Sequence, residues 1–363
     1  MLTGMRLGAP LERYELAHVC GPNVRRIGAF TVATPKATGR IFLRKLLCCL
    51  PVSLAGRLRR AKYQSDAVLG KFPNQAEISW FTRALDRLKP DAVLIDTIFR
   101  APLLAASELP KSNRILVTHD VFHRRAEALE MAGYRVQPEG LTKQREAQLL
   151  ANAFHIAAIQ PDEADLLRGM CPQANIFMAP MPALPCPPAP GVEKIAGRIV
   201  FIGSDTLPNL DGLRWFFAEI WPEIRDHGIT LDLIGDCGPV LHRLPPGVNI
   251  LGRVPNLAPI LHRAALAISP LRIGSGLKIK LLDYARHGLF TVATPPSLQG
   301  FSTGAASPFI AAGSAAMFAE SILRHVIAPP QPQAALTYVS QHYDTESAFA
   351  GLRAALPPLT YPA

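Results

Sequence analysis

The stretch that decides the fold is Leu266–Gly288, which reads LAISPLRIGSGLKIKLLDYARHG. Its apolar start predicts a buried strand over Leu266–Ser269, and its end predicts a helix over Leu277–His287. Between them lies a turn bracketed by Gly274 and Gly276. This order is typical of a phosphate site, because glycines let the backbone approach an anion and a helix start offers free N–H groups.

Charged residues surround this turn. Arg272, Lys278 and Lys280 supply positive charge that would offset a diphosphate. The two lysines are two positions apart and point to different sides of a regular helix, so we expect at most one to touch phosphate. Asp283 lies further along the helix, where it could accept hydrogen bonds from ribose hydroxyls. The alternative is an ordinary loop–helix junction with solvated lysines.

Strands and helices alternate on both sides of this stretch. In the second half, we predict strands at Arg198–Gly203, Thr230–Gly235, Val248–Leu251, Leu266–Ser269, Phe290–Ala293 and Phe309–Ala311. Further helices are predicted at Leu210–Asp226, Leu257–Ala264 and Ala315–Val326. The alternation indicates an α/β domain with a doubly wound parallel sheet, which binds ligands at the carboxyl ends of its strands.

The first half has the same pattern. Strands are predicted at Glu15–Cys20, Arg26–Val32, Ala92–Asp96, Arg114–His119, Phe154–Gln160 and Asn175–Ala179, and helices at Glu77–Leu88 and Leu141–Ala153. A proline-rich run, PMPALPCPPAPG at 180–191, can form neither a helix nor a central strand. We therefore predict a first domain over 1–180, a linker over 181–191, a second domain over 192–332 and a helical tail over 333–363 that packs back on the first domain.

Composition limits the class of protein. The 363 residues suit two domains, and no run of about 20 apolar residues predicts a membrane span. The first ten residues do not resemble a signal peptide. The six cysteines form no CxxC pair and no ligand-like spacing with histidine, so we expect a reduced cytoplasmic protein without a metal site.

The positive charge is concentrated near the N-terminus. The net charge is +10, and ten basic residues but no acidic one lie between Leu16 and Ser65. Residues 41–62 mix Arg and Lys with apolar residues, as in amphipathic segments on anionic surfaces. A membrane surface is the first candidate partner and an anionic substrate the second. Nucleic acid is not expected, because no binding module accompanies the charge. A solvated basic face remains the alternative.

Several motifs together resemble a known family. In the second half they are Gly203-Ser204, LIGD at 233–236, LGRV at 251–254, the Leu266–Gly288 stretch, TVAT at 291–294 and QGF at 299–301. In the first half, LKPDAV at 88–93 and VTHDV at 117–121 agree. From about Ala84 to Phe301, the chain resembles glycosyltransferases of the GT-B fold, in the large retaining group often called family 4.

The resemblance implies two Rossmann-like domains that face a cleft. The second would bind a nucleotide-sugar donor, and the first a saccharide or lipid-linked acceptor. Asp283 stands where the family binds the donor ribose, usually with glutamate, and His119 matches a histidine near the donor sugar. Ser275 replaces the earlier glutamate of the family's paired acids. The family needs no divalent metal, and the sequence has no Asp-x-Asp motif at a strand end.

These arguments define the candidate site. The candidate catalytic residues are His119 and Lys280, and the candidate donor-binding residues are Gly203, Ser204, Arg272, Gly274, Ser275, Gly276, Leu277, Lys278 and Asp283. No cofactor besides the donor is expected. The acidic run Asp162–Asp165 is interpreted as a helix start, and His287 as a packing residue. The alternatives to a glycosyltransferase are a non-catalytic scaffold that binds a nucleotide or a protein, and a nucleotide-sugar epimerase.

Overall fold

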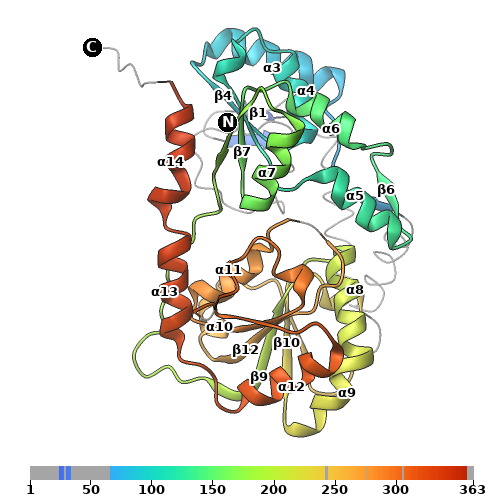
Figure 1. Cartoon of the computed structure of the whole chain (residues 1–363), viewed down its shortest axis with the longest axis vertical. Helices are drawn as coiled ribbons and strands as arrows, with labels where there is room; N and C mark the ends of the chain where they lie inside the picture. Colours follow the sequence, from blue (N-terminus) through green and yellow to red (C-terminus); the bar gives the residue numbers. More distant parts are fainter. Residues whose placement is uncertain are drawn as a thin grey trace.

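The computed structural model describes residues 24–27, 30–33, 66–241, 244–274, 276–304 and 306–357. Figure 1 shows two α/β domains, one above the other, with the last two helices alongside both. The predicted strand Glu15–Cys20, the basic segment 41–62 and Ser275 lie outside the described residues. Within the described ranges, no helix is both long and apolar enough to cross a membrane.

The second domain contains one parallel sheet of six strands. In chain order they are β9 (Ile195–Ile202), β10 (Thr230–Ile234), β11 (Val248–Gly252), β12 (Ala264–Ser269), β13 (Thr291–Ala293) and β14 (Phe309–Ala311). Their spatial order is β11-β10-β9-β12-β13-β14. The order reverses between β9 and β12, and such a switch point is where doubly wound sheets bind ligands.

Helices cover both faces of this sheet. They are α8 (Leu207–Trp215), α9 (Trp221–Ile224), α10 (Ala258–Leu261), α11 (Ile279–Arg286) and α12 (Ala315–Val326). Along β9, Phe201 packs in a core cluster with Phe216 and Phe318. Its neighbour Val200 packs in a different cluster with Tyr284 of α11. Since successive residues of a strand face opposite sides, α8 and α12 cover one face and α11 the other.

The helix predicted over Leu210–Asp226 is present, but it is not α-helical throughout. A π-helical segment, Phe216–Ile220, separates α8 from α9. Pro222 lies in the first turn of α9, and proline has no N–H to donate to the preceding turn. Apolar periodicity alone does not reveal this interruption.

The first domain contains a parallel sheet of four strands, β4 (Val93–Asp96), β5 (Arg114–Val117), β7 (His155–Ala158) and β8 (Asn175–Met178), in the order β4-β5-β7-β8. A separate parallel pair joins β3 (Asp66–Val68) to β6 (Arg135–Gln137). The helices are α3 (Gln75–Leu88), α4 (Ala101–Ala105), α5 (Phe122–Met131), α6 (Lys143–Leu150) and α7 (Pro161–Met170).

The prediction of one strand over Arg26–Val32 is wrong. The structure has two antiparallel strands there, β1 (Val24–Ile27) and β2 (Phe30–Ala33). Ile27 pairs with Phe30, so the chain reverses within the predicted strand. A short apolar and basic run fits either one strand or two.

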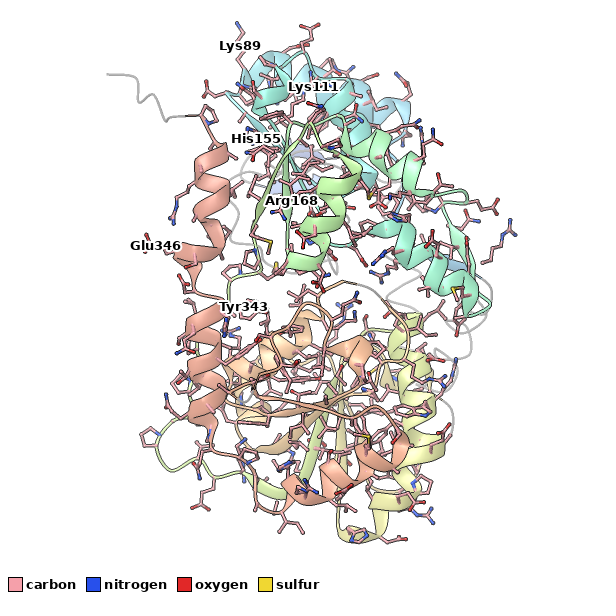
Figure 2. The ribbon with its side chains drawn as sticks, viewed as in Figure 1. Lys89, Lys111, His155, Arg168, Tyr343 and Glu346 are labelled. Atoms are coloured by element: carbon pink, nitrogen blue, oxygen red, sulfur yellow. The ribbon has the colours of Figure 1, made fainter. Side chains whose placement is uncertain are left out.

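The helical tail predicted over 333–363 forms two separate helices. They are α13 (Pro332–His342) and α14 (Thr345–Ala355). In Figure 1 both are red, with α13 beside the second domain and α14 beside the first. Tyr343, labelled in Figure 2, lies between them. Its carbonyl accepts a hydrogen bond from Ala183 N at 2.8 Å, so the tail and the linker adjoin where both pass between the domains.

Candidate functional site

Two loops meet at the switch point of the second domain. One follows β9 and begins at Gly203, and the other follows β12 and begins at Pro270. Helix α8 packs directly on the second loop, because a Cβ atom at Gly212 would lie 2.5 Å from the Pro270 carbonyl oxygen. The glycine turn predicted to hold phosphate therefore lies at the edge of the sheet where α/β domains bind ligands.

The backbone of this turn contacts the first domain. Gly276 has a φ of +77°, and a Cβ atom there would lie 3.0 Å from the Asp120 carboxylate and 3.1 Å from the His119 carbonyl oxygen. Only glycine combines this conformation with this close approach. The helix itself begins at Ile279, two residues later than predicted, with Lys278 at the N-cap position.

Lys280, in the first turn of α11, connects this helix to α8. Its Nζ donates to Asn209 Oδ1 at 2.6 Å and lies 4.2 Å from the centre of the Phe201 ring. Asn209 Nδ2 in turn donates to the Ser204 carbonyl oxygen at 3.1 Å. Burial lowers the pKa of Lys280 to about 7. An ammonium group in such surroundings gains a large advantage from an anionic ligand.

Lys278 points elsewhere. Its Nζ donates to the Gly276 carbonyl oxygen at 2.5 Å. Burial lowers the pKa of Lys278 to about 8, although Asp120 and Glu163 of the first domain oppose this shift. The two lysines thus have different partners, as their spacing predicts. That at most one of them touches phosphate stays a prediction.

The other predicted donor-site residues have varied surroundings. Arg272 already has a carboxylate partner. Its Nη2 lies 2.7 Å from Asp211 Oδ1 and its Nε lies 3.1 Å from Asp211 Oδ2, so a phosphate would share this guanidinium with Asp211. Leu277 is buried in an apolar cluster that includes Ile159 of the first domain. Asp283 is half-buried, 3.8 Å from Arg286, and burial raises the pKa of its carboxyl group.

In the first domain, His119 follows β5 and pairs through Nε2 with Asp96 at the end of β4. The hydrogen bond to Asp96 raises the pKa of His119, against the opposing effect of burial. The His119 carbonyl adjoins Gly276 of the phosphate turn. A partly exposed imidazole with a carboxylate partner therefore lies at the boundary between the two domains.

A buried acidic cluster lies beside His119, and the sequence analysis did not predict it. Asp120 and Glu163 are only 1% and 3% exposed. Gln160 Nε2 donates to Glu163 Oε1 at 2.6 Å, and Arg125 Nη1 pairs with Asp120 Oδ2 at 3.1 Å. Burial, and then the charge of Asp120, raise the pKa of Glu163 to about 8. Glu163 therefore retains a proton at neutral pH.

The acidic cluster opens into a pocket of about 410 Å³ that both domains line. Asp120, Arg124 and Glu163 come from the first domain, and Gly276 and Gln299 from the second. Next to Gln299, the backbone of Gly300 lies so close to Gln160 that a Cβ atom would be 1.7 Å from its Oε1. This pocket is the part of the cleft where a ligand would touch both domains.

Comparisons with known sequences found matches to part of the chain. Residues 196–326 match the family model described as Glycosyl transferases group 1. A curated relative, an uncharacterized 44.6 kDa protein in the cps region of Klebsiella pneumoniae, is 24% identical over 173 residues, which are 43% of this chain and 45% of that protein.

Solved structures share the fold. TarM of S. aureus superposes with a TM-score of 0.61 at 14% identity, over 77% of this chain and 58% of TarM. Sucrose-phosphate synthase of Thermosynechococcus elongatus superposes with a TM-score of 0.56 at 11% identity, over 89% and 92% of the two chains. The chain thus spans less than two thirds of TarM and under half of the curated relative. It has the GT-B architecture and resembles the group 1 glycosyltransferases.

Proposed function

We propose that this chain is a glycosyltransferase that moves a sugar from a nucleotide-diphosphate donor to a saccharide or lipid-linked acceptor. One observation carries the proposal: the glycine turn at the switch point of the second domain, next to the helix that carries Lys280, adjoins His119 and the acidic cluster of the first. A donor diphosphate on the turn would place its sugar toward the pocket that both domains line. One TarM structure is of a complex with UDP, which supports a donor of this class.

In the proposed reaction, the bond between the sugar anomeric carbon and the diphosphate oxygen breaks, and a bond to the acceptor oxygen forms. The acceptor hydroxyl proton leaves with the diphosphate. The N–H groups at Gly276 and Leu277, together with Lys280, would stabilise the negative charge on the leaving group. Groups fixed before the reaction are effective because they need no reorganisation as the charge develops.

The first domain would position the sugar. The His119 imidazole, paired with Asp96, would donate to a sugar hydroxyl. Protonated Glu163 would donate to a donor or acceptor oxygen, because its raised pKa keeps the proton near neutral pH. Asp283 would accept from the ribose. We propose that the lysines and the turn take the place of a divalent metal, and that the anomeric configuration is retained, as in the family that the motifs resemble.

The basic segment 41–62 suggests where the reaction occurs. Its Arg and Lys residues, interleaved with apolar ones, suit an anionic membrane surface on the cytoplasmic side. We propose that the protein acts in the cytoplasm at the inner face of the membrane, close to a lipid-linked acceptor. Co-sedimentation with anionic liposomes, before and after changing Arg57, Arg59 and Arg60 to Glu, tests this part; equal sedimentation of both proteins would refute it.

The enzymatic proposal is tested with a panel of nucleotide sugars. We expect one donor to be consumed faster when a matching saccharide or lipid-linked acceptor is present, with release of the nucleoside diphosphate. Donor binding without any turnover would indicate a non-catalytic scaffold. A changed sugar still attached to the nucleotide, formed without acceptor, would indicate an epimerase.

A further inference from the structure

Three potential metal ligands meet in the second domain near the linker. They are Cys186 of the linker, His262 directly after α10, and His287 at the end of α11. One ligand atom from each residue lies within 4.8 Å of the others. None of the three takes part in the proposed sugar transfer. His287 is buried, while Cys186 and His262 are partly exposed.

Two hydrogen bonds fix the segments that carry these ligands, one between backbone groups and one from a side chain. Cys186 N donates to the Arg286 carbonyl oxygen at 2.6 Å, and Arg286 Nε donates to the Leu184 carbonyl oxygen at 3.0 Å. These contacts hold the linker against the end of α11. The positive charge of Arg286, next to His287 in the sequence, would oppose the binding of a cation. It is partly balanced by the Asp283 carboxylate, which lies 3.8 Å from Arg286 Nη1.

Both histidines have one ring nitrogen bound to a backbone carbonyl. His262 Nε2 lies 2.8 Å from the Cys186 oxygen, and His287 Nδ1 lies 2.7 Å from the Asp283 oxygen. A carbonyl can only accept, so these nitrogens carry the protons and the opposite nitrogens carry lone pairs. Metal-binding histidines usually show this pattern, with the second nitrogen donating to a carbonyl or carboxylate.

We propose that Cys186, His262 and His287 form a binding site for Zn²⁺, with water as the fourth ligand. One thiolate and two imidazoles are a common zinc ligand set. Tetrahedral zinc with these ligands needs donor atoms roughly 3.3–3.6 Å apart. One ligand atom of each side chain already lies within 4.8 Å of the others, so the three side chains are close enough for small rotations to bring them to this spacing. Binding replaces the thiol proton of Cys186 by the Zn–S bond and releases that proton to solvent.

The site would fasten the linker to α11, the helix that carries Lys280 and Asp283. A bound ion would then restrain the joint between the two domains without touching the cleft. Spacing along the sequence does not predict the site, because its ligands lie 76 and 25 positions apart and only the fold brings them together. Cysteine spacing along the chain gave no metal signal, because the three side chains meet only in the fold.

The first test uses the full chain stripped of metal and then given one equivalent of Zn²⁺. Alkylation of each cysteine is followed by mass spectrometry of peptides. We expect Zn²⁺ to slow alkylation of Cys186 at least about tenfold. Since this measurement needs no variant, a folding defect cannot obscure it. An unchanged rate at Cys186 overturns the proposal.

The second test uses Co²⁺ as a spectroscopic probe. The wild type should show a thiolate-to-Co²⁺ band and intense tetrahedral d–d bands. Cys186→Ser should lose the thiolate band, and His287→Gln should weaken Zn²⁺ binding more than about tenfold. His227→Gln, at an exposed histidine, is the control and should bind as the wild type does. A thiolate band that persists in Cys186→Ser would assign the metal to other cysteines and refute the site.

Discussion

At the scale of single residues, the surroundings of Lys280 suit an ammonium group that binds an anionic ligand. Its ammonium lies against Asn209 and the Phe201 ring, and burial lowers its pKa to about 7. A positive charge in this position lowers the free energy of unfolding unless an anionic ligand compensates it. A bound diphosphate would supply this compensation.

Replacing Lys280 with Met tests this interpretation. We expect kcat/KM to fall by about 10²–10³, the usual effect of removing one preorganised donor to a developing charge, while the Tm of the ligand-free protein stays equal to or rises above that of the wild type, because a buried charge is removed. Lys194→Met is the matched control, because burial lowers the pKa of Lys194 to about 8 as well but its Nζ faces the Gly288 carbonyl. Equal losses in both variants would mean that Lys280 has only a structural role.

Glu163 predicts a pH dependence of stability. Its pKa is raised from 4.5 to about 8, so between these values the folded state holds more protons than the unfolded state, and stability falls as pH rises. Glu163→Gln removes this titration. From pH 5 to pH 8, the Tm of the wild type should therefore fall relative to that of the variant. Thermal melts across this range measure the difference.

The control for this pH series is Glu139→Gln. Glu139 is exposed, and its pKa is lowered by Arg135, so its titration is complete below the range of the experiment. The difference between this variant and the wild type should stay constant from pH 5 to pH 8. A constant difference for Glu163→Gln as well would contradict the buried, protonated carboxyl.

Single residues also show what the sequence can predict of the site. The glycine turn, Lys280 and His119 were predicted because they lie in recognisable motifs. Asp96, Asn209 and Glu163 were not, because each gains its role from a contact with a residue far along the chain. In the sequence, Glu163 is only one acid at a helix start.

At the scale of elements, prediction succeeded where one signal dominated. The buried strand β12 and the helix α12 follow directly from apolar runs and periodicity. It failed where local rules gave more than one answer, as in the hairpin of β1 and β2. Pairing partners and tertiary packing decide such cases, and neither is visible in a short window of sequence.

The packing of α14 on the first domain gives a prediction at the scale of elements. A Cβ atom at Gly351 would lie 2.5 Å from the Phe177 ring and 2.7 Å from the Met178 carbonyl oxygen. Gly351→Ala should therefore lower the free energy of unfolding by about 1–3 kcal/mol. Urea denaturation measures this change.

Gly169→Ala is the matched helical control. Nothing lies within 4 Å of a Cβ atom at this position in α7, so the variant should gain about 0.5–1 kcal/mol from reduced backbone entropy. Opposite signs for the two substitutions support the docking of α14. A neutral or stabilising effect at Gly351 would contradict it.

At the scale of the whole molecule, the two domains approach each other closely at Gly300. A Cβ atom there would overlap the Gln160 side chain, which is itself held by Glu163, and Gly300 has a φ of +83°. Gly300→Ala should displace the Gln160 side chain from Glu163 and push the loop that carries residue 300 away from the first domain. We expect a larger radius of gyration in small-angle X-ray scattering and a loss of about 10²-fold in kcat/KM, as for a misplacement of about 1 Å.

The control for this substitution is nearby. A Cβ atom at Gly304 would meet nothing within 4 Å, so Gly304→Ala should keep both the radius of gyration and the activity of the wild type. If Gly300→Ala behaves in the same way, the contact between Gly300 and Gln160 does not control the approach of the domains.

The central claim is that the glycine turn after β12 binds the donor diphosphate, and a crystal structure with a nucleoside diphosphate tests it most directly. The claim predicts that the distal phosphate lies within hydrogen-bonding distance of the amides near Gly276 and of Lys280 Nζ, with the ribose facing Asp283. A nucleotide bound elsewhere, with the turn and Lys280 still engaged only by Asn209 and their own loop, would contradict it.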